Sequence, residues 1–344
     1  ILDNDLRAAI QLNKLDQAQP ALNAYKQMAS GDAADAGAAE VLKELVIFIP
    51  PQLEELKRKN DPAALEAAKK KFGDILADTL KPLPGDKLTP KLKYFTARIY
   101  SSLDKHKEAA ELLEKMPEPS AGAPQPDTEL NESVRVMLAH ERRLDGDLKA
   151  AREVMDGIMG TREKPGWGRK KIDALIENVE LLGAEGDNKQ AAEIANALVQ
   201  KLLPRIDADN KIKDLYLQCY YLVVENVYRQ AVKIKDKAPD KYPEGVKTAA
   251  TLAVDLARKQ LGFVNDATRG RFRDLMEGEP DLKDAFLDGY LTAVETRAKE
   301  ADAKDKAQRD KALSDAAALV LELERMWPDD GGDKVKPRVD ALLG

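Results

Sequence analysis

A short phrase recurs along this chain of 344 residues and constrains the fold more than any other feature. In each copy an apolar helical stretch ends at a polar turn, and a second helical stretch then opens with Ala residues. The copies of this phrase lie near Leu15, Asn60, His106, Gly146 and Gly186. A unit that recurs at intervals of roughly 40 to 46 residues buries its apolar face against the next copy, so the pattern predicts a stacked array of helices.

The residues of the turn support this interpretation in two of the copies, Gly146-Asp147 and Gly186-Asp187. Gly readily takes the left-handed conformation that ends a helix. Asp caps the first turn of the helix that follows. Ala151 and Ala191 stand at the same place after each turn, and their small side chains let two helix axes approach closely. We therefore expect antiparallel helix pairs joined by tight turns.

The phrase resembles the tetratricopeptide repeat, a helix pair with a small residue and an aromatic residue on the first helix and a fixed Ala on the second. One copy matches with Ala97, Tyr100 and Ala109, the next has Ala139 as its small residue, and the third has Val179 at that position. The Ala positions that anchor the second helices are Ala18, Ala64, Ala109, Ala151 and Ala191. Their intervals exceed the family's roughly 34 residues and approach those of HEAT repeats. We favour the tetratricopeptide interpretation because the Gly-Asp turn recurs.

The resemblance implies an all-α fold, a right-handed α-α superhelix of antiparallel helix pairs. It covers residues 1–203, and residues 204–344 are expected to form longer, irregular helical pairs that continue the same solenoid. There the apolar spacing predicts helices over 209–236, 244–261, 281–300, 304–326 and 335–343. Composition predicts loops over 117–127 and 161–171, whereas 32–39 fits either a loop or the start of a helix.

Composition and charge exclude several classes of function. Charged residues make up 34% of the chain and aromatic residues 5%, a balance typical of helices and, in our interpretation, of a bacterial protein. The net charge of −6 argues against a general affinity for nucleic acid or anionic membranes. The single Cys219 excludes an internal disulfide and a Cys-rich metal site. No apolar run approaches the roughly 20 residues that cross a bilayer.

Two basic segments were weighed as binding sites. The Gly-rich segment 160–171 offers cations to an anion, but it lacks the Gly-Lys-Ser/Thr element of a phosphate-binding loop, so we favour a linker in which Trp167 packs across a junction. The cluster at 269–273 loosely suggests contact with nucleic acid, but acidic residues flank it, and we favour a solvated turn. The two histidines, His106 and His140, fall in different repeats. We therefore expect no catalytic residue, no cofactor and no metal.

Four tyrosines gather on the predicted helix 209–236, namely Tyr216, Tyr220, Tyr221 and Tyr228. Tyr commonly buries its ring and leaves the hydroxyl at the surface, which favours a role in the core. An aromatic strip that contacts a partner is the alternative.

In the family that the sequence resembles, the first helix of each pair lines a concave binding face. By position in the repeats, the residues expected on that face are Tyr94, Arg98, Val136, His140, Arg143, Glu177 and Glu180. Basic groups pass into acidic ones along this set, which suits a peptide or helix of alternating charge. Tyr and Arg are also enriched at the residues that dominate binding energy.

We therefore expect a non-catalytic helical-repeat scaffold that binds a protein or peptide and does not bind nucleic acid. Two alternatives stay open: a helical segment of a larger enzyme or sensor whose active module lies elsewhere, and an α-helical protein that binds an anion or small ligand. The chain begins at Ile1, which we interpret as a processed protein or a fragment, so its localisation stays open between cytoplasm and periplasm.

Overall fold

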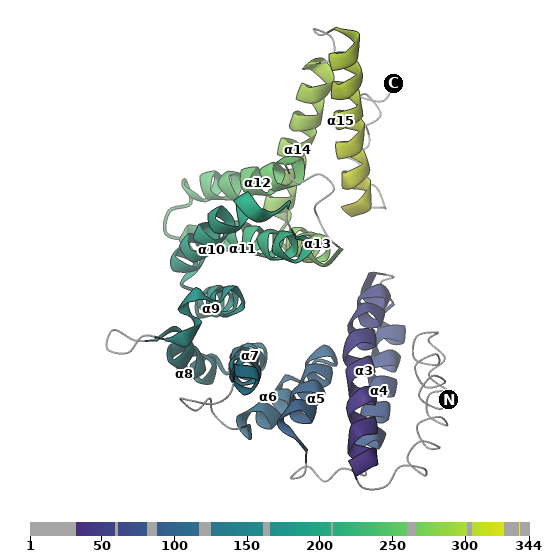
Figure 1. The fold of residues 1–344 in the computed structure, drawn as a ribbon. Coiled ribbons are helices and arrows are strands. Elements are labelled where there is room, and N and C mark those ends of the chain that lie inside the picture. The colour runs from purple at the N-terminus through teal and green to yellow at the C-terminus, as the bar shows by residue number, and fades with distance from the viewer. Residues whose placement is uncertain are drawn as a thin grey trace. The chain divides into compact units, whose positions relative to one another are not determined.

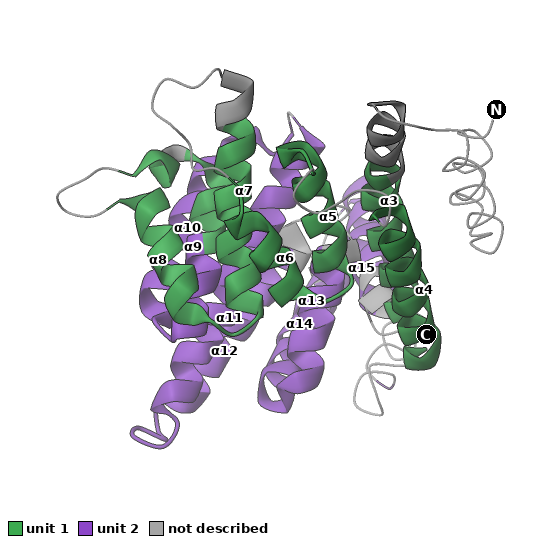
Figure 2. Ribbon diagram, turned by 90° about the horizontal axis from the view of Figure 1, so that it is seen from below, with its two compact units in different colours: residues 1–177 green, residues 178–344 purple. Residues whose placement is uncertain are grey.

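The computed structural model describes residues 32–58, 61–80, 88–116, 125–160, 166–207, 209–259, 266–300, 305–326 and 337. Within these ranges the fold is all-α, with thirteen α-helices and two short 3₁₀ helices. The chain divides into two compact units, residues 1–177 and residues 178–344, which Figure 2 draws in green and purple. The predicted change in repeat character after residue 203 stays a prediction.

Helices follow one another along the chain, and most of them pack on a neighbour in sequence (Figure 1). The first unit holds α3 (Asp32–Arg58), α4 (Pro62–Leu80), α5 (Pro90–Ser102), α6 (His106–Glu114), α7 (Gln125–Leu144), α8 (Leu148–Met159) and the 3₁₀ helix η1 (Trp167–Lys170). Helix α9 (Ile172–Glu185) spans the division. The second unit continues with α10 (Asn188–Leu202), η2 (Leu203–Arg205), α11 (Asn210–Ile234), α12 (Tyr242–Lys259), α13 (Asp266–Gly278), α14 (Pro280–Glu300) and α15 (Lys306–Met326).

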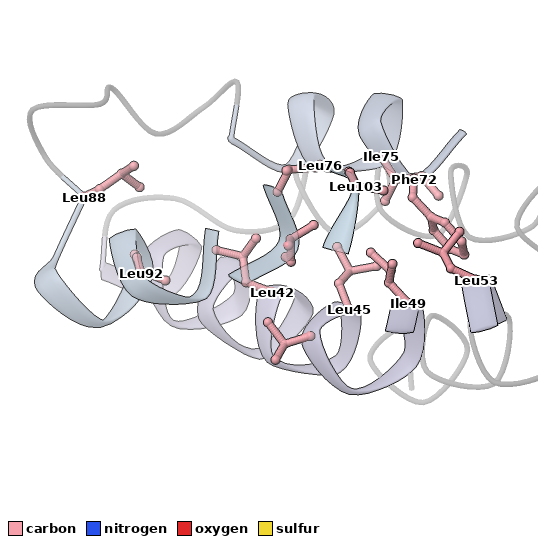
Figure 3. Close-up of a cluster of buried hydrophobic side chains, with 12 residues drawn as sticks. Leu42, Leu45, Ile49, Leu53, Phe72, Ile75, Leu76, Leu88, Leu92 and Leu103 are labelled. Atoms are coloured by element: carbon pink, nitrogen blue, oxygen red, sulfur yellow. The ribbon is translucent and has the colours of Figure 1, made fainter. Parts of the chain in front are cut away.

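An apolar core joins the first three described helices of unit 1. Its buried side chains come from α3, α4 and α5 and include Leu42, Leu45, Ile49, Phe72, Ile75, Leu92 and Ile99 (Figure 3). On α3, Leu42, Leu45 and Ile49 share one face of the helix because they recur at helical spacing. Burial of this face against α4 and α5 holds the three helices together.

Small side chains lie where the next helices of unit 1 meet. Ala97 on α5, Ala109 on α6, Ala139 on α7 and Ala151 on α8 are all completely buried. Because Ala ends at Cβ, two helices approach closely where it lies between them. These helices pack consecutively, α5 on α6, α6 on α7 and α7 on α8. The burial that the repeat phrase predicted for these Ala residues is therefore confirmed.

The turn inside a helix pair has the predicted conformation. Gly146 has a φ of 84°, in the left-handed region, and the Asp147 carboxylate accepts a hydrogen bond from the backbone N–H of Ala150. The Gly186-Asp187 turn repeats both features. In the pair before them, Asp104 takes the left-handed place with a φ of 57°. Since Asp tolerates this region better than most side chains, the same turn forms there without Gly.

Helix α11 lies at the centre of unit 2 and packs against α10, α12 and α13. Tyr216, Tyr221 and Tyr228 on this helix are buried, and Tyr220 is half-buried. The predicted role of these rings in the core is thus confirmed for three of the four. The predicted helices over 209–236, 244–261, 281–300 and 304–326 correspond to α11, α12, α14 and α15, and α14 packs on α15 as expected.

Some expectations about loops were wrong. Residues 269–273 do not form a solvated turn: they lie inside helix α13, and Phe272 packs edge-on against Tyr221 with ring centroids 5.1 Å apart. The predicted loop 117–127 ends earlier than expected, because α7 begins at Gln125. The ambiguous segment 32–39 is helical. Apart from residue 337, the predicted helix 335–343 lies outside the described residues.

Two consecutive prolines, Pro50 and Pro51, lie inside helix α3. Proline has no backbone N–H, so the carbonyl groups of Val46 and Ile47 lack the donors that a helix ordinarily supplies four residues later. Ile47 is also 62% exposed, an unusual position for a large apolar side chain. Helix α3 is therefore interrupted in its hydrogen bonding at about its middle.

Candidate functional surface

Four of the seven residues predicted to line a binding face belong together on the first helices of two successive pairs. Tyr94 and Arg98 lie one helical turn apart on α5, and Val136 and His140 lie one turn apart on α7. Arg98 is exposed and the other three are half-buried. Helices α5 and α7 contact each other, and both pairs hold the same place relative to a buried Ala. We call these four residues the α5/α7 surface.

His140, Arg143 and Glu177 form an ion-pair cluster within unit 1. The Nδ1 nitrogen of His140 lies 2.9 Å from Oε2 of Glu177, and Nε of Arg143 donates to Oε1 of Glu177 at 2.7 Å. A second nitrogen of Arg143 donates to Oε2 at 3.2 Å. Glu177 is buried, whereas the His140 side chain is 39% exposed. The guanidinium group thus grips the carboxylate with two hydrogen bonds, and the imidazole adds a third.

The charges of this cluster stabilise one another. Burial alone would lower the pKa of His140, but the hydrogen bond and the negative charge of Glu177 outweigh it, and the pKa is raised above 6.5. Burial alone would raise the pKa of Glu177, yet the bonds from His140 and Arg143 lower it below 4.5. Both shifts favour the ion pair. We therefore assign the proton on Nδ1 of His140 to the hydrogen bond with Glu177.

Glu180 belongs to a second cluster, which lies in unit 2. Its carboxylate is 3.1 Å from a guanidinium nitrogen of Arg271 on α13, and Glu225 on α11 lies 3.9 Å from the other nitrogen. The guanidinium group also stacks over the ring of Tyr221 at 4.2 Å from its centroid. Burial raises the pKa of Glu225, even though Arg271 counteracts it. Arg271 therefore ties α13 to two other helices through charge and through the aromatic ring.

Sequence reasoning missed a recurring contact between the start of a second helix and the following first helix. His106, the first residue of α6, places Nδ1 2.8 Å from Oε2 of Glu141 on α7. Asn188, the first residue of α10, donates to Oδ1 of Asn226 on α11 at 3.0 Å. The Glu141 side chain is fully enclosed, and its Oε1 has no hydrogen-bond partner among the described residues. Polar residues about one repeat apart in sequence are the signal that identifies such pairs.

The Gly-rich segment 160–171 is described from residue 166 onward. A Cβ atom added to Gly166 would lie only 2.1 Å from the carbonyl oxygen of Ile158, so the chain is tightly packed there. Arg169 donates to the carbonyl oxygen of Met159 at 2.6 Å. Lys171 pairs with Glu132 and lies over the Trp167 ring. Two of the basic side chains thus make contacts inside unit 1, which supports the interpretation as a linker.

Within the described residues, no group of three or more His, Cys, Asp or Glu side chains is arranged to hold a metal ion. Those residues also include no helix that is both long and apolar enough to cross a membrane.

Comparisons with known proteins give a likeness at the level of architecture. No family model matches the sequence, and no curated protein is significantly similar to it. Among solved structures, the chain is similar to one described as a "Circular tandem repeat protein with novel repeat topology and enhanced subunit contact surfaces". The two share 14% sequence identity with a TM-score of 0.24, over 94% of this chain and 82% of that chain. The present chain is thus all-α, with helices that pack in sequence.

Proposed function

We propose that this protein is a non-catalytic scaffold whose helical repeats bind another protein or a peptide, and that the α5/α7 surface makes the contact. The observation that supports the proposal is the repeated pattern on α5 and α7. Each helix buries its Ala against a neighbour and, on the adjoining positions, leaves Tyr94 and Arg98 or Val136 and His140 accessible to solvent. Repeats of this kind supply extended surfaces for a partner.

The contacts of the site narrow the chemistry of that partner. Arg143 and Glu177 neutralise each other, so Arg98 and the imidazole of His140 are the charged groups that the α5/α7 surface offers. Tyr94 adds an aromatic ring that is partly open to solvent. A peptide or helix that presents acidic and apolar side chains fits this combination. Arg and Tyr are the residue types that most often dominate such interfaces.

Affinity capture with a matched pair of charge reversals tests the proposal. Arg98→Glu alters the α5/α7 surface, and Lys107→Glu makes the same change of charge at an exposed position on α6. We expect wild type and the Lys107→Glu variant to retain the same protein from native lysate, and Arg98→Glu to retain at least about tenfold less. The captured protein, once purified, should show the same ranking in direct titration. Equal retention by both variants, or no specific partner in any of several lysates, contradicts the proposal.

A further inference from the structure

A groove runs along the surface of unit 2 between α12 and α14, with a volume of about 760 Å³. Val246, Ala250 and Val254 on α12 line its floor, together with Ala285 and Gly289 on α14. The three α12 residues recur one turn apart and therefore form a row along the helix. Ala250, Ala285 and Gly289 carry no side chain beyond Cβ, which keeps the groove open between two helices that pack on each other.

The rim of the groove is acidic. Asp281, Asp284 and Asp288 are exposed on α14 at spacings that place them on one face, and Asp255 on α12 also lines the groove. Lys247 is the basic residue of the lining. Four carboxylates against one ammonium group give the rim a net negative charge, so the groove pairs an apolar floor with an acidic edge.

One end of the groove is ordered by contacts within the protein. The hydroxyl group of Tyr242 donates to Asp281 at 2.8 Å, and Lys235 lies 3.5 Å from the same carboxylate. The ammonium group of Lys235 also lies 4.4 Å from the centre of the Tyr242 ring. Even with Lys235 counted, carboxylates outnumber ammonium groups around the groove. A partner's charges would therefore be attracted chiefly to the part of the rim that holds Asp284 and Asp288.

We propose that the α12/α14 groove binds a helical segment of a partner protein that carries Lys or Arg one turn apart beside a face of small apolar residues. The alkyl stems of Lys and Arg pack on an apolar floor while their charged ends reach the rim. The lining extends from Tyr242 to Asp255 along α12, about 20 Å at 1.5 Å per residue, which accommodates roughly four turns of a docked helix. Complementary charge favours such a partner over an acidic one.

This inference does not depend on the proposed role of the α5/α7 surface, because the groove lies wholly in unit 2. The probe is a synthetic helical peptide of about 15 residues with Lys at relative positions 1, 4 and 8 and Ala or Leu on the adjoining face, a spacing that follows the Asp residues of α14. A scrambled peptide of the same composition is its control. Failure of Arg98→Glu to affect partner capture leaves the result of this experiment unchanged.

A dye at the rim reports where the peptide binds. Thr251 is exposed and lines the groove, so a Thr251→Cys variant of the full chain carries an environment-sensitive fluorophore there. The natural Cys219 does not compete for the label, because it is buried and burial raises the pKa of its thiol to about 12. We expect the ordered peptide to change the emission in a saturable way, to bind at least about tenfold more tightly than the scrambled one, and to weaken with added salt.

Matched variants decide whether the groove is responsible. The pair Asp284→Asn and Asp288→Asn should weaken binding at least about fivefold, whereas Asp236→Asn with Asp310→Asn removes the same charge from exposed positions outside the lining and should change it less than about twofold. Gly289→Leu, which fills the floor, should also abolish binding. Its added Cβ would lie 3.4 Å from a Val254 methyl group, an ordinary contact distance.

Three results overturn the proposal. Equal losses in the two Asp-to-Asn pairs would mean that only overall charge attracts the peptide. A wild-type dimer that the groove variants convert to a monomer in sedimentation would assign the groove to a second copy of this chain. A large gain in peptide affinity after deletion of residues 327–344 would assign it to that segment.

Discussion

Nδ1 of His140 lies 2.9 Å from Oε2 of Glu177, and Arg143 holds the same carboxylate at 2.7 Å. Because the pKa of His140 is raised in the folded protein, its contribution to stability is complete below about pH 6.5 and is lost as the pH rises through the folded-state pKa. The pKa of Glu177 is lowered, so its contribution is present above about pH 4.5 and is lost as the pH falls through its folded-state pKa.

We expect wild type to exceed a His140→Gln variant in free energy of unfolding by more at about pH 5.5 than at about pH 8, by a few tenths to about 1 kcal/mol, since the exposed part of this side chain is screened by solvent. Urea unfolding measured at both values checks this. Trp167 fluorescence in a Trp327→Phe background restricts the signal to unit 1. A difference that is the same at both pH values contradicts the assigned protonation.

The two buried glutamates of unit 1 should respond differently to removal of their charge. Glu177→Gln leaves Arg143, whose side chain is 11% exposed, without its carboxylate, and we expect a loss of about 2–4 kcal/mol. Glu141→Gln keeps an acceptor for His106 and removes a charge from an enclosed position, so it should cost less than about 1 kcal/mol. Urea unfolding with the Trp167 signal compares the two, and equal losses would show that the charge of Glu177 is unimportant.

The left-handed turn predicts opposite effects of one substitution at two glycines. Gly146→Ala forces Ala to a φ of 84° and should cost about 1–2 kcal/mol. Gly157→Ala lies inside α8, where an added Cβ meets nothing within 4 Å, and should stabilise the protein by about 0.5–1 kcal/mol. Urea unfolding of both variants, with Gly146→Asn as a variant of intermediate cost, measures the difference. A neutral Gly146→Ala would exclude strain in this turn.

Arg271 and Arg273 on α13 provide a third matched pair. Arg271 contacts Glu180 and the Tyr221 ring, so Arg271→Ala should destabilise unit 2 by about 1–2 kcal/mol. Arg273 lies 3.9 Å from Asp274 and 4.0 Å from Glu277, and its loss should cost less than about 0.5 kcal/mol. Hydrogen exchange of α13 amides reads out both effects. Equal protection in the two variants contradicts a specific role for Arg271.

Local chemistry explains why much of the fold was predictable. The burial of Ala97, Ala139 and Ala151 follows from their places in the repeat phrase, and the conformation of Gly146 follows from its position between two helices. Helix α13 was missed because Gly270 and a dense set of charges obscure the helical spacing of its buried side chains, among them Phe272. Its helix depends on contacts with α11, which short-range patterns do not encode.

The candidate site was predictable only in part. Helical spacing placed Tyr94 and Arg98 on one face of α5, and the structure agrees that both reach solvent. It did not predict that Glu177 is buried against His140 and Arg143, because that contact depends on how far one helix is shifted along another. Side chains in different helices meet or miss by a shift of a few ångströms, and periodicity within one helix does not determine that shift.

The prolines in α3 have a consequence for how unit 1 opens. A helix normally unravels from its ends, because each inner amide is locked by the turn before it. At Pro50 and Pro51 that continuity is broken, so the segments on either side exchange their amide protons with water as separate cooperative blocks. The block that begins the helix can therefore loosen while Leu53 stays packed in the core, and the exposed Ile47 lies beside this natural hinge.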